Sequence, residues 1–446
     1  MRPPYQWNGT AVNGRLSKLK ALFAAAVLLL LLSCGRGPSK PSVVLIIIDT
    51  LRADHLSCYG YSRNTSPVID SLAESGTLME NAFAQSSWTL PASATLMSGL
   101  STISHGAGMD VPTGNVYGMD PMMPLLASLL NENGYRTAGF FNVYLLGGDF
   151  GFHRGFDTFM CRENGDGMAV ETVDSALEWL EGVPEGDPFF LAIHFFDVHD
   201  PYDPPAPYDT YYTPDGACGE VFWEMTPEGG VARPEQLDHL KGLYDGEIAF
   251  VDNQLERLFA AVRSLNRESL PLVILTADHG EEFLEHGYVG HGRTLYPEIT
   301  HVPLIISGPG AQEGVRCSLL CGQVDILPTV LDYCAIPMPS GVEGVSLLEI
   351  DGGSDRILPS SGINTGHDFN SVAVRRGWKL LIWNPETDST ETYDLREDPL
   401  ALTPVSCDSQ LLDEALYYRS TPCSWDAVML EKWKVAPVLR DLGYIN

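Results

Sequence analysis

Three apolar runs that each end at a carboxylate constrain the fold of this chain more than any other feature. They span residues 42–48, 188–196 and 270–277, and they are followed by Asp49, Asp197 and Asp278. Uninterrupted β-branched and aromatic residues, without polar alternation, are typical of parallel strands that helices cover on both faces. Ligands of such sheets gather at the carboxyl ends of the strands. The pattern therefore predicts one site to which all three strands contribute.

The segments between and after these runs predict the rest of the architecture. Apolar residues recur at helical spacing in residues 67–76, 123–133 and 244–265. Further strands are expected at 302–307, 371–376, 378–383 and 391–395. The predicted fold class is α/β, with a large central, mostly parallel sheet flanked by helices in a catalytic domain at 42–350. A smaller antiparallel sheet forms the predicted C-terminal subdomain at 351–446.

The N-terminal segment has the pattern of an export signal. Basic residues precede a short apolar run at 21–32, which is too short to span a bilayer comfortably. The ending Leu-Leu-Ser-Cys resembles a bacterial lipobox, which predicts a lipid on Cys34, a signal at 1–34 and a tether at 35–41. An ordinary signal peptide and an uncleaved anchor are the alternatives. Each predicts an exported protein, periplasmic or at the cell surface.

The net charge excludes one class of partner, and the cysteine content bears on disulfide formation. The net charge is −31, from 58 acidic and 27 basic residues, which argues against nucleic acid because a polyanion requires a basic patch. A solvated acidic surface is the expected cause. Export permits disulfides, although spacing does not assign the pairs. The candidates are Cys58, Cys161, Cys218, Cys317, Cys321, Cys334, Cys407 and Cys423.

Thr89, in SSWTLPASATLMSG, carries a hydroxyl of the kind that serves as a nucleophile once it is activated. Its position also suits a helix N-cap, because Pro91 fits a first turn and residues 92–97 continue as a helix. The two interpretations are compatible, since a helix N-terminus presents free amides to an anion. Thr89, Asp49, Asp278 and His279 together provide a hydroxyl, two carboxylates and an imidazole. This set of potential ligands suits a divalent cation.

These residues, in this order, resemble the alkaline phosphatase superfamily, and its sulfatase branch in particular. The motifs that carry the resemblance are IDTLRADHLSCYGY, NTSPVIDSLAESGTLMENAFA, FFDVHDPYDPP, TADHGEEFLEHG, HGRTLYPEITHVPLII and TETYDLREDP. The resemblance implies a metal ion held by Asp49, Thr89, Asp278 and His279. Zinc, manganese or calcium is expected, at one site, with a second cation near Asp197 as the alternative.

Three positions depart from the sulfatase pattern. Thr89 stands where the family has the Cys or Ser that is converted to formylglycine, and threonine cannot give that aldehyde. Thr50 stands in place of a second aspartate, and Ser93 stands in place of an arginine. Thr89 would therefore act as a plain alkoxide, and a phosphorus centre suits the site better than a sulfate monoester with calcium.

His199 and His291 are the next candidates, since one follows a central strand and the other follows the Asp-His pair. Either would bind a non-bridging oxygen or protonate the leaving group. Together with Asp197 they form the predicted substrate-binding set. His286 and His301 are weaker candidates. Arg52 and Asp54 are expected to form a structural ion pair.

The predicted function is metal-dependent hydrolysis of phosphodiesters or phosphonate monoesters through a covalent intermediate on Thr89. The alternatives are a sulfuric ester hydrolase, a phosphoryl-group transferase and a catalytically inactive lipid-anchored binding protein. The expected partner is an anionic ester, either a small molecule or part of a lipid or glycan. Membrane contact is expected only through the lipid anchor or the signal.

Overall fold

The computed structural model describes most of the chain after residue 39. The described residues are 40–110, 115–162, 169–213, 225–226, 229–230, 234–265, 270–348, 355–362, 370–431, 435 and 439. The predicted export signal, the predicted lipid attachment site at Cys34, most of the tether and Cys218 lie outside them. Residues 41–446 form one compact unit.

An eight-stranded sheet, in the order β15-β2-β14-β11-β1-β8-β6-β7, forms the centre of this unit. Its middle strand, β1 (Val43–Ile48), runs parallel to both β8 (Phe189–Phe195) and β11 (Leu272–Ala277). These are the three predicted strands, and every residue in them is buried. The other strands are β2 (Gly76–Met79), β6 (Arg136–Phe141), β7 (Thr158–Cys161), β14 (Leu304–Ser307) and β15 (Val315–Cys317). Because β14 pairs antiparallel with β11 and β2, the sheet is mixed but mostly parallel, as predicted.

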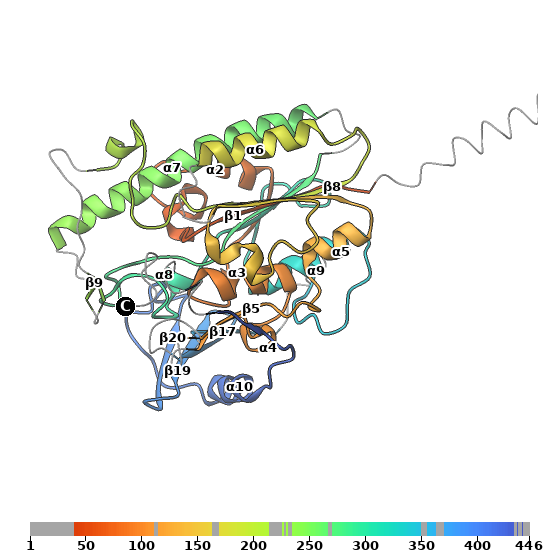
Figure 1. Cartoon of the computed structure of the whole chain (residues 1–446). Helices are drawn as coiled ribbons and strands as arrows, with labels where there is room; N and C mark the ends of the chain where they lie inside the picture. The colour runs from red at the N-terminus through yellow and green to blue at the C-terminus, as the bar shows by residue number, and fades with distance from the viewer. Residues whose placement is uncertain are drawn as a thin grey trace, which may run out of the picture. The chain divides into compact units, whose positions relative to one another are not determined.

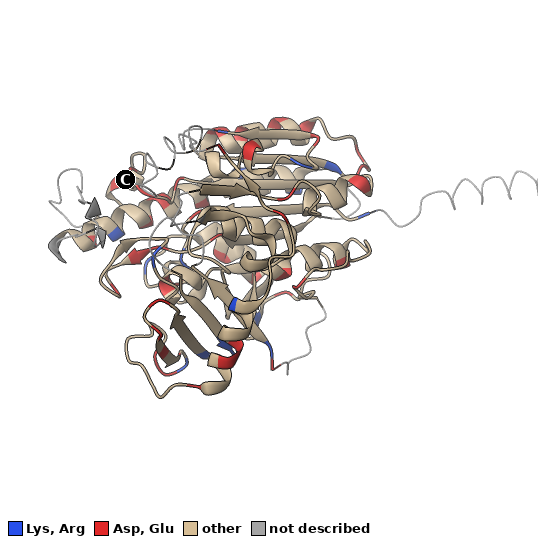
Figure 2. Cartoon of the chain, turned by 60° about the horizontal axis from the view of Figure 1, so that its bottom comes forward, with Lys and Arg blue, Asp and Glu red and all other residues tan. Residues whose placement is uncertain are grey.

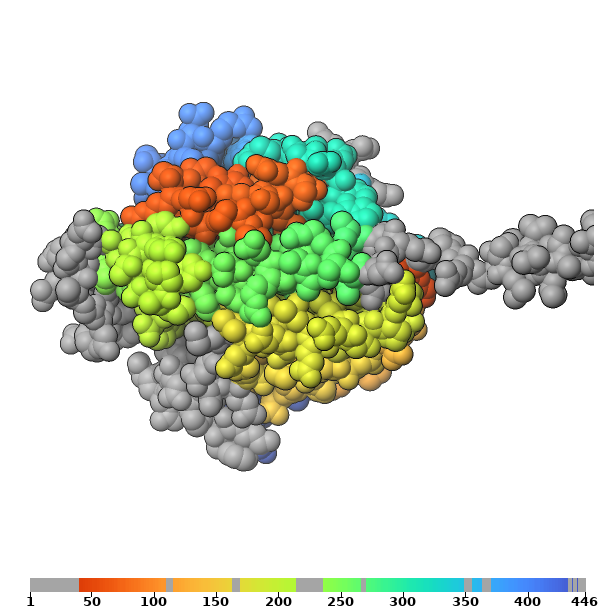
Figure 3. All heavy atoms as spheres, turned by 90° about the horizontal axis from the view of Figure 1, so that it is seen from above, coloured from red at the N-terminus to blue at the C-terminus, as the bar shows by residue number. Residues whose placement is uncertain are grey.

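Helices cover both faces of the sheet (Figure 1). On one face lie α2 (Pro67–Glu74), α6 (Ala169–Glu181) and α7 (Pro234–Ser264). Figure 3 looks onto this face, where α7 runs beside α6. On the other face lie α3 (Thr89–Ser98), α5 (Leu126–Glu132) and α9 (Ile326–Tyr333). The helix predicted at 244–265 corresponds to the last two thirds of α7, which begins ten residues earlier and also buries Leu240.

The buried carboxylate of Asp252 joins α7 to the first turn of α2. It accepts hydrogen bonds from the backbone N–H groups of Val68 (3.0 Å) and Ile69 (2.9 Å). First-turn amides have no partner within their own helix, so Asp252 satisfies two donors that would otherwise be buried without acceptors. We expect Asp252→Ala to lower the free energy of unfolding by about 2–3 kcal/mol, and Asp252→Asn, which keeps one acceptor, by less. Urea denaturation measures both changes.

The control for this prediction is Asp174→Ala on α6. Asp174 pairs with Arg257, and both side chains are largely exposed. Removing such a surface pair changes stability by no more than about 1 kcal/mol. Equal losses for Asp174→Ala and Asp252→Ala would contradict a capping role for Asp252.

A four-stranded antiparallel sheet follows near the C-terminus. It consists of β17 (Ile357–Ser361), β18 (Val372–Arg376), β19 (Lys379–Asn384) and β20 (Ser389–Asp394), with α10 (Ser409–Ser420) packed against it. The three strands predicted here are confirmed, whereas β17 and α10 were not predicted. Buried Arg375 of β18 donates to the Leu295 carbonyl (3.2 Å), and its guanidinium lies 4.2 Å from the centroid of the Phe83 ring. The small sheet therefore packs against the segments that carry Phe83 and Leu295, which lie outside the strands of the main sheet.

The acidic residues are dispersed over the molecule, and no disulfide joins the described cysteines. Acidic side chains are spread over helices and loops in Figure 2 rather than gathered on one element. The described cysteines form no disulfide with one another; they are Cys58, Cys161, Cys317, Cys321, Cys334, Cys407 and Cys423. Within the described ranges, no helix combines the length and apolar character needed to cross a bilayer.

Candidate active site

The sheet brings Asp49, Asp278 and His279 together at its carboxyl edge. Ile48 of β1 pairs with Ala277 of β11, so the residues that follow these two strands are neighbours. The side chains of Asp49, Asp278 and His279 are fully buried. His279 Nε2 lies 3.6 Å from Asp49 Oδ1 and 3.4 Å from Asp278 Oδ2. The edge thus carries two carboxylates and one imidazole within a few ångströms.

Helix α3 adds the hydroxyl of Thr89 to this group. Thr89 is the first residue of the helix, and its Oγ1 lies 3.4 Å from His279 Nε2. The helix is buried along its whole length, and Leu90 and Ala94 pack in the core beneath the sheet. Its N-terminus therefore points into the site from a fixed position, with first-turn amides and the positive end of the helix dipole available to an anion.

His194 also belongs to this group, although its sequence position did not indicate it. It lies inside β8, where it pairs with Ile47 of β1. Ala192 and Phe196 pack on the sheet face that α3 covers, as does Ile47, and the alternation of the strands puts His194 and Asp49 on that same face. His194 Nε2 lies 3.3 Å from Asp49 Oδ2. The feature of the sequence that could have identified His194 is that it is the one polar residue within an apolar strand.

The side chains of this cluster fit a divalent cation. Within the described part of the chain, both oxygens of Asp49, Oδ2 of Asp278 and both ring nitrogens of His194 are buried without hydrogen bonds. Ligand atoms of these three residues lie within 4.8 Å of one another. The separations of 3.3–3.6 Å are too long for strong hydrogen bonds. They approach the about 3.4 Å between neighbouring ligands of a tetrahedral ion with metal–ligand distances near 2.1 Å.

The protonation of His279, Asp49 and Asp278 also favours a bound divalent cation. His279 Nδ1 donates to the carbonyl of Gly280 (2.9 Å), which leaves the Nε2 lone pair directed at the cluster. Burial acts to raise the pKa of Asp49, but the rings of His194, His199 and His279 outweigh it and hold that pKa below its usual value. Burial, with the charge of Asp49, raises the pKa of Asp278 to about 6. The paired carboxylates thus carry negative charge that a cation would neutralise.

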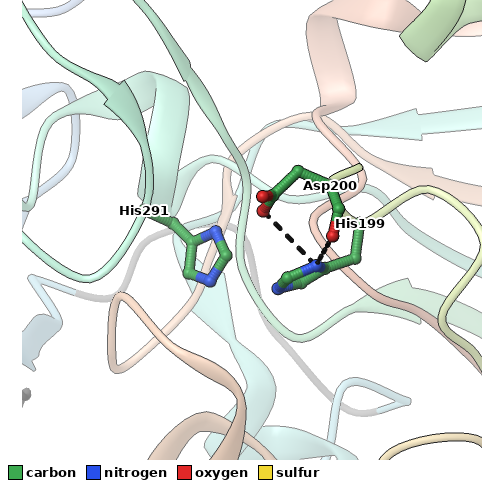
Figure 4. Close-up of side chains that lie close together, drawn as sticks. All are labelled: His199, Asp200 and His291. Atoms are coloured by element: carbon green, nitrogen blue, oxygen red, sulfur yellow. Dashed lines mark hydrogen bonds and ion pairs between the residues drawn. The ribbon is translucent and has the colours of Figure 1, made fainter. Parts of the chain in front are cut away.

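The two predicted histidines lie close to each other, next to Asp200 (Figure 4). His199 Nδ1 donates to the Asp200 carbonyl (2.6 Å) and lies 3.4 Å from the Asp200 carboxylate. The ring centroid of His291 is 4.8 Å from that of His199 and 4.6 Å from that of His279. The structure therefore brings His199 and His291 together with the strand-end residues.

A second layer holds His291 in place. Its Nδ1 lies 3.0 Å from Oε1 of Glu281, whose Oε2 accepts a hydrogen bond from the Tyr202 hydroxyl (2.8 Å). Burial, together with the charge of Asp200, raises the pKa of Glu281 well above its usual range. Sequence reasoning did not identify Glu281 or Tyr202, although Glu281 lies within the motif that begins at the Asp-His pair.

Asp197 and the weaker candidates lie apart from the cluster. Asp197 Oδ1 accepts the backbone N–H of Ala169 (2.6 Å) at the start of α6, on the opposite face of the sheet from α3. His286 Nδ1 pairs with Glu298 (2.5 Å), and His301 Nε2 donates to the Glu80 carbonyl (3.0 Å). These contacts give the three side chains structural partners.

Three further side chains that were singled out also have defined surroundings. Arg52 forms the expected ion pair with Asp54 (2.8 Å). Thr50 adopts a left-handed backbone conformation (φ 52°), and its hydroxyl donates to the Val198 carbonyl (2.8 Å). Ser93 is buried in α3, and its hydroxyl has no hydrogen bond among the described residues. Neither Thr50 nor Ser93 contributes a charged group.

Known proteins share the sequence pattern and the fold. A family model described as Sulfatase matches residues 41–336, and one described as N-sulphoglucosamine sulphohydrolase, C-terminal, matches residues 284–415. An arylsulfatase of Clostridium perfringens is 25% identical over 437 residues, which cover 82% of this chain and 90% of its own. The phosphonate monoester hydrolase of Agrobacterium radiobacter superposes with a TM-score of 0.65 at 20% identity, covering 90% and 96% of the two chains. A 2-O GAG sulfatase gives 0.67 at 20% identity, covering 91% and 94%.

Proposed function

The chain belongs to the sulfatase family, and we propose that it is a metal-dependent hydrolase that cleaves phosphodiesters or phosphonate monoesters, with Thr89 as the nucleophile. The observation that carries this proposal is the Thr89 hydroxyl, which is buried at the N-terminus of α3 and lies 3.4 Å from His279 Nε2. Threonine cannot give formylglycine, so a hydroxyl remains as the attacking group. A reaction through that hydroxyl forms an ordinary ester intermediate.

Asp49, Thr89, Asp278 and His279 are the proposed metal-holding residues. A divalent cation at this position supplies Lewis-acid chemistry, because it lowers the pKa of a nearby oxygen by several units and offsets the charge of an anionic ester. Three buried carboxylate oxygens favour such an ion, because both oxygens of Asp49 and Oδ2 of Asp278 accept no hydrogen bond from the described residues. Oδ1 of Asp278 accepts the backbone N–H groups of His279 (2.9 Å) and Thr50 (3.3 Å).

The first step is an in-line attack of Thr89 Oγ1, as the alkoxide, on phosphorus. The bond from phosphorus to the leaving oxygen breaks, and His199 Nε2 gives that oxygen a proton, so that a free alcohol and a phosphothreonine ester result. The Nε2 proton of His291 and the free amides of α3 bind the non-bridging oxygens. Water then attacks phosphorus, and His199 Nε2 takes one of its protons while the other stays on the product. The bond from phosphorus to Thr89 Oγ1 breaks, which restores the alkoxide and releases the phosphate or phosphonate product.

The side chains around Thr89 favour a phosphorus centre over sulfate. Thr50 and Ser93 carry no charge where the sulfatase pattern has an aspartate and an arginine. The phosphonate monoester hydrolase of Agrobacterium radiobacter shares the fold at 20% identity, so the architecture accommodates this class of substrate. Sulfuric ester hydrolysis is the second candidate function, favoured by the arylsulfatase relative.

We also propose an exported protein, periplasmic or at the cell surface, with a lipid on Cys34. The basic residues, the apolar run at 21–32 and the lipobox-like ending support this location. An enzyme so placed would meet anionic glycans, lipids or small esters.

A panel of nitrophenyl substrates tests the reaction class. We expect kcat/KM for bis-p-nitrophenyl phosphate or a p-nitrophenyl phosphonate to exceed that for p-nitrophenyl sulfate by at least about 100-fold, a difference of about 2.7 kcal/mol. Each substrate is measured with zinc, manganese and calcium, and chelation is expected to abolish turnover. Activity confined to the sulfate, with calcium, would replace the first candidate function with the second.

A further inference from the structure

We infer that His194 is a direct ligand of the catalytic cation and that it adapts the site to zinc or manganese rather than calcium. The inference rests on the proposed metal-dependent function. His194 Nε2 lies 3.3 Å from Asp49 Oδ2, and ligand atoms of His194, Asp49 and Asp278 lie within 4.8 Å of one another. This is the spacing expected of side chains that share one ion.

Within the described residues, His194 has the Asp49 carboxylate as an ion-pair neighbour at 3.3 Å but no hydrogen-bond partner. It is fully buried in β8, paired with Ile47, and its ring lies edge-on to Phe141 at 6.4 Å between centroids. Neither of its ring nitrogens makes a hydrogen bond to any part of the chain that the structure describes. A buried polar group without a hydrogen bond costs about 1–3 kcal/mol, which a metal–nitrogen bond would offset.

His105 shows how a structural histidine of this chain differs. It is also fully buried, but both of its ring nitrogens have partners. Its Nε2 lies 3.1 Å from the Thr95 hydroxyl, and its Nδ1 accepts the N–H of Ala107 at 3.0 Å. Burial alone therefore does not leave an imidazole unsatisfied in this fold, and the bare ring of His194 requires another explanation.

Thr50 explains why the site has room for another ligand. Its hydroxyl donates to the Val198 carbonyl, so the residue after Asp49 gives the cluster no carboxylate. With His194, the donor set becomes two imidazoles, two carboxylates and the Thr89 hydroxyl. Calcium takes oxygen ligands, whereas imidazole nitrogen suits zinc and other transition metals. The second nitrogen thus moves the preference away from calcium.

X-ray absorption of the full chain loaded with one equivalent of zinc tests this assignment without any substitution. The expected spectrum shows two imidazole ligands, His194 and His279, and the count falls to one in His194→Gln. A single imidazole in the unaltered protein would overturn the inference while leaving the metal-dependent function intact. A protein that binds no zinc, manganese or calcium would instead overturn the proposed function itself.

Affinity measurements provide the matched comparison. We expect His194→Gln to weaken zinc binding by at least about 100-fold in chelator competition, because indirect supporting residues already cost 10–100-fold. His105→Gln, at a buried position outside the site, should change the zinc affinity by no more than about threefold. His194→Asp, which restores an oxygen donor, should lower the zinc-to-calcium affinity ratio by at least about tenfold. Unchanged zinc affinity in a folded His194→Gln protein would refute direct coordination.

Discussion

Replacing Thr89 by alanine is expected to lower kcat on an aryl phosphodiester by at least about 10³-fold, because the proposed reaction passes through an ester on this hydroxyl. Four other side chains of the cluster, Asp49, His194, Asp278 and His279, keep their positions on strands that do not depend on Thr89. We therefore expect the variant to bind zinc with no more than a modest loss of affinity. Metal content by mass spectrometry and single-turnover kinetics measure the two effects separately.

The matched control is Thr89→Ser, which keeps the hydroxyl and removes one methyl group. It should retain activity within about tenfold of the unaltered enzyme, since a serine hydroxyl can attack in the same way. Intact-mass measurement must show that the serine has not become formylglycine, because serine, unlike threonine, can give that aldehyde.

The intermediate can be trapped directly. Acid quenching during turnover of a phosphorus-labelled diester should leave the label on the peptide that contains Thr89, and Thr89→Ala should carry none. Full activity in Thr89→Ala would mean that water attacks phosphorus directly, and the nucleophile assignment would then be wrong.

Much of the fold and part of this site follow from short-range sequence patterns. The parallel strands were predictable because their apolar runs are continuous, and Asp49, Asp278 and His279 were candidates because they directly follow such runs. The small C-terminal sheet was predicted in part, since three of its four strands were expected, at 371–376, 378–383 and 391–395. In each case the signal lies within about ten residues.

What the sequence did not reveal depends on contacts between distant segments. His194 meets Asp49 only because β8 and β1 pair in one particular register. The carboxyl group of Glu281 contacts both His291 and Tyr202. The spacing of these residues in the sequence does not predict the two contacts. Thr50 adopts its left-handed conformation where its amide lies 3.3 Å from Asp278, a residue of another strand end.

Asp197 shows a limit of reasoning from strand ends. Like Asp49 and Asp278 it follows an apolar run, yet it meets the N-terminus of α6. The reason is the alternation of side chains: Phe190, Ala192 and Phe196 of this segment pack on the α3 face, so the odd-numbered positions face the other helical layer. One extra residue between strand and carboxylate is enough to change the face.

Replacing His199 by glutamine is expected to slow cleavage of alkyl phosphodiesters by about 10²–10⁴-fold, the usual contribution of a general acid. An alkoxide is a poor leaving group and needs the proton from Nε2. A nitrophenolate leaves without one, so activity on the nitrophenyl ester should fall by less than about tenfold. The Asp200 carbonyl accepts the Nδ1 proton (2.6 Å), which leaves Nε2 as the ring nitrogen that faces away from this hydrogen bond.

The dependence on the leaving group separates an acid from a residue that only binds or positions. In a series of esters with alcohols of rising pKa, the slope of log kcat should steepen in His199→Gln and stay unchanged in His286→Gln, whose ring stacks on Tyr296. A uniform loss across the series would assign His199 to binding of the non-bridging oxygens instead. His291, whose Nδ1 is held by Glu281, would then be the remaining imidazole able to reach the leaving oxygen, and His291→Gln should show the steeper slope.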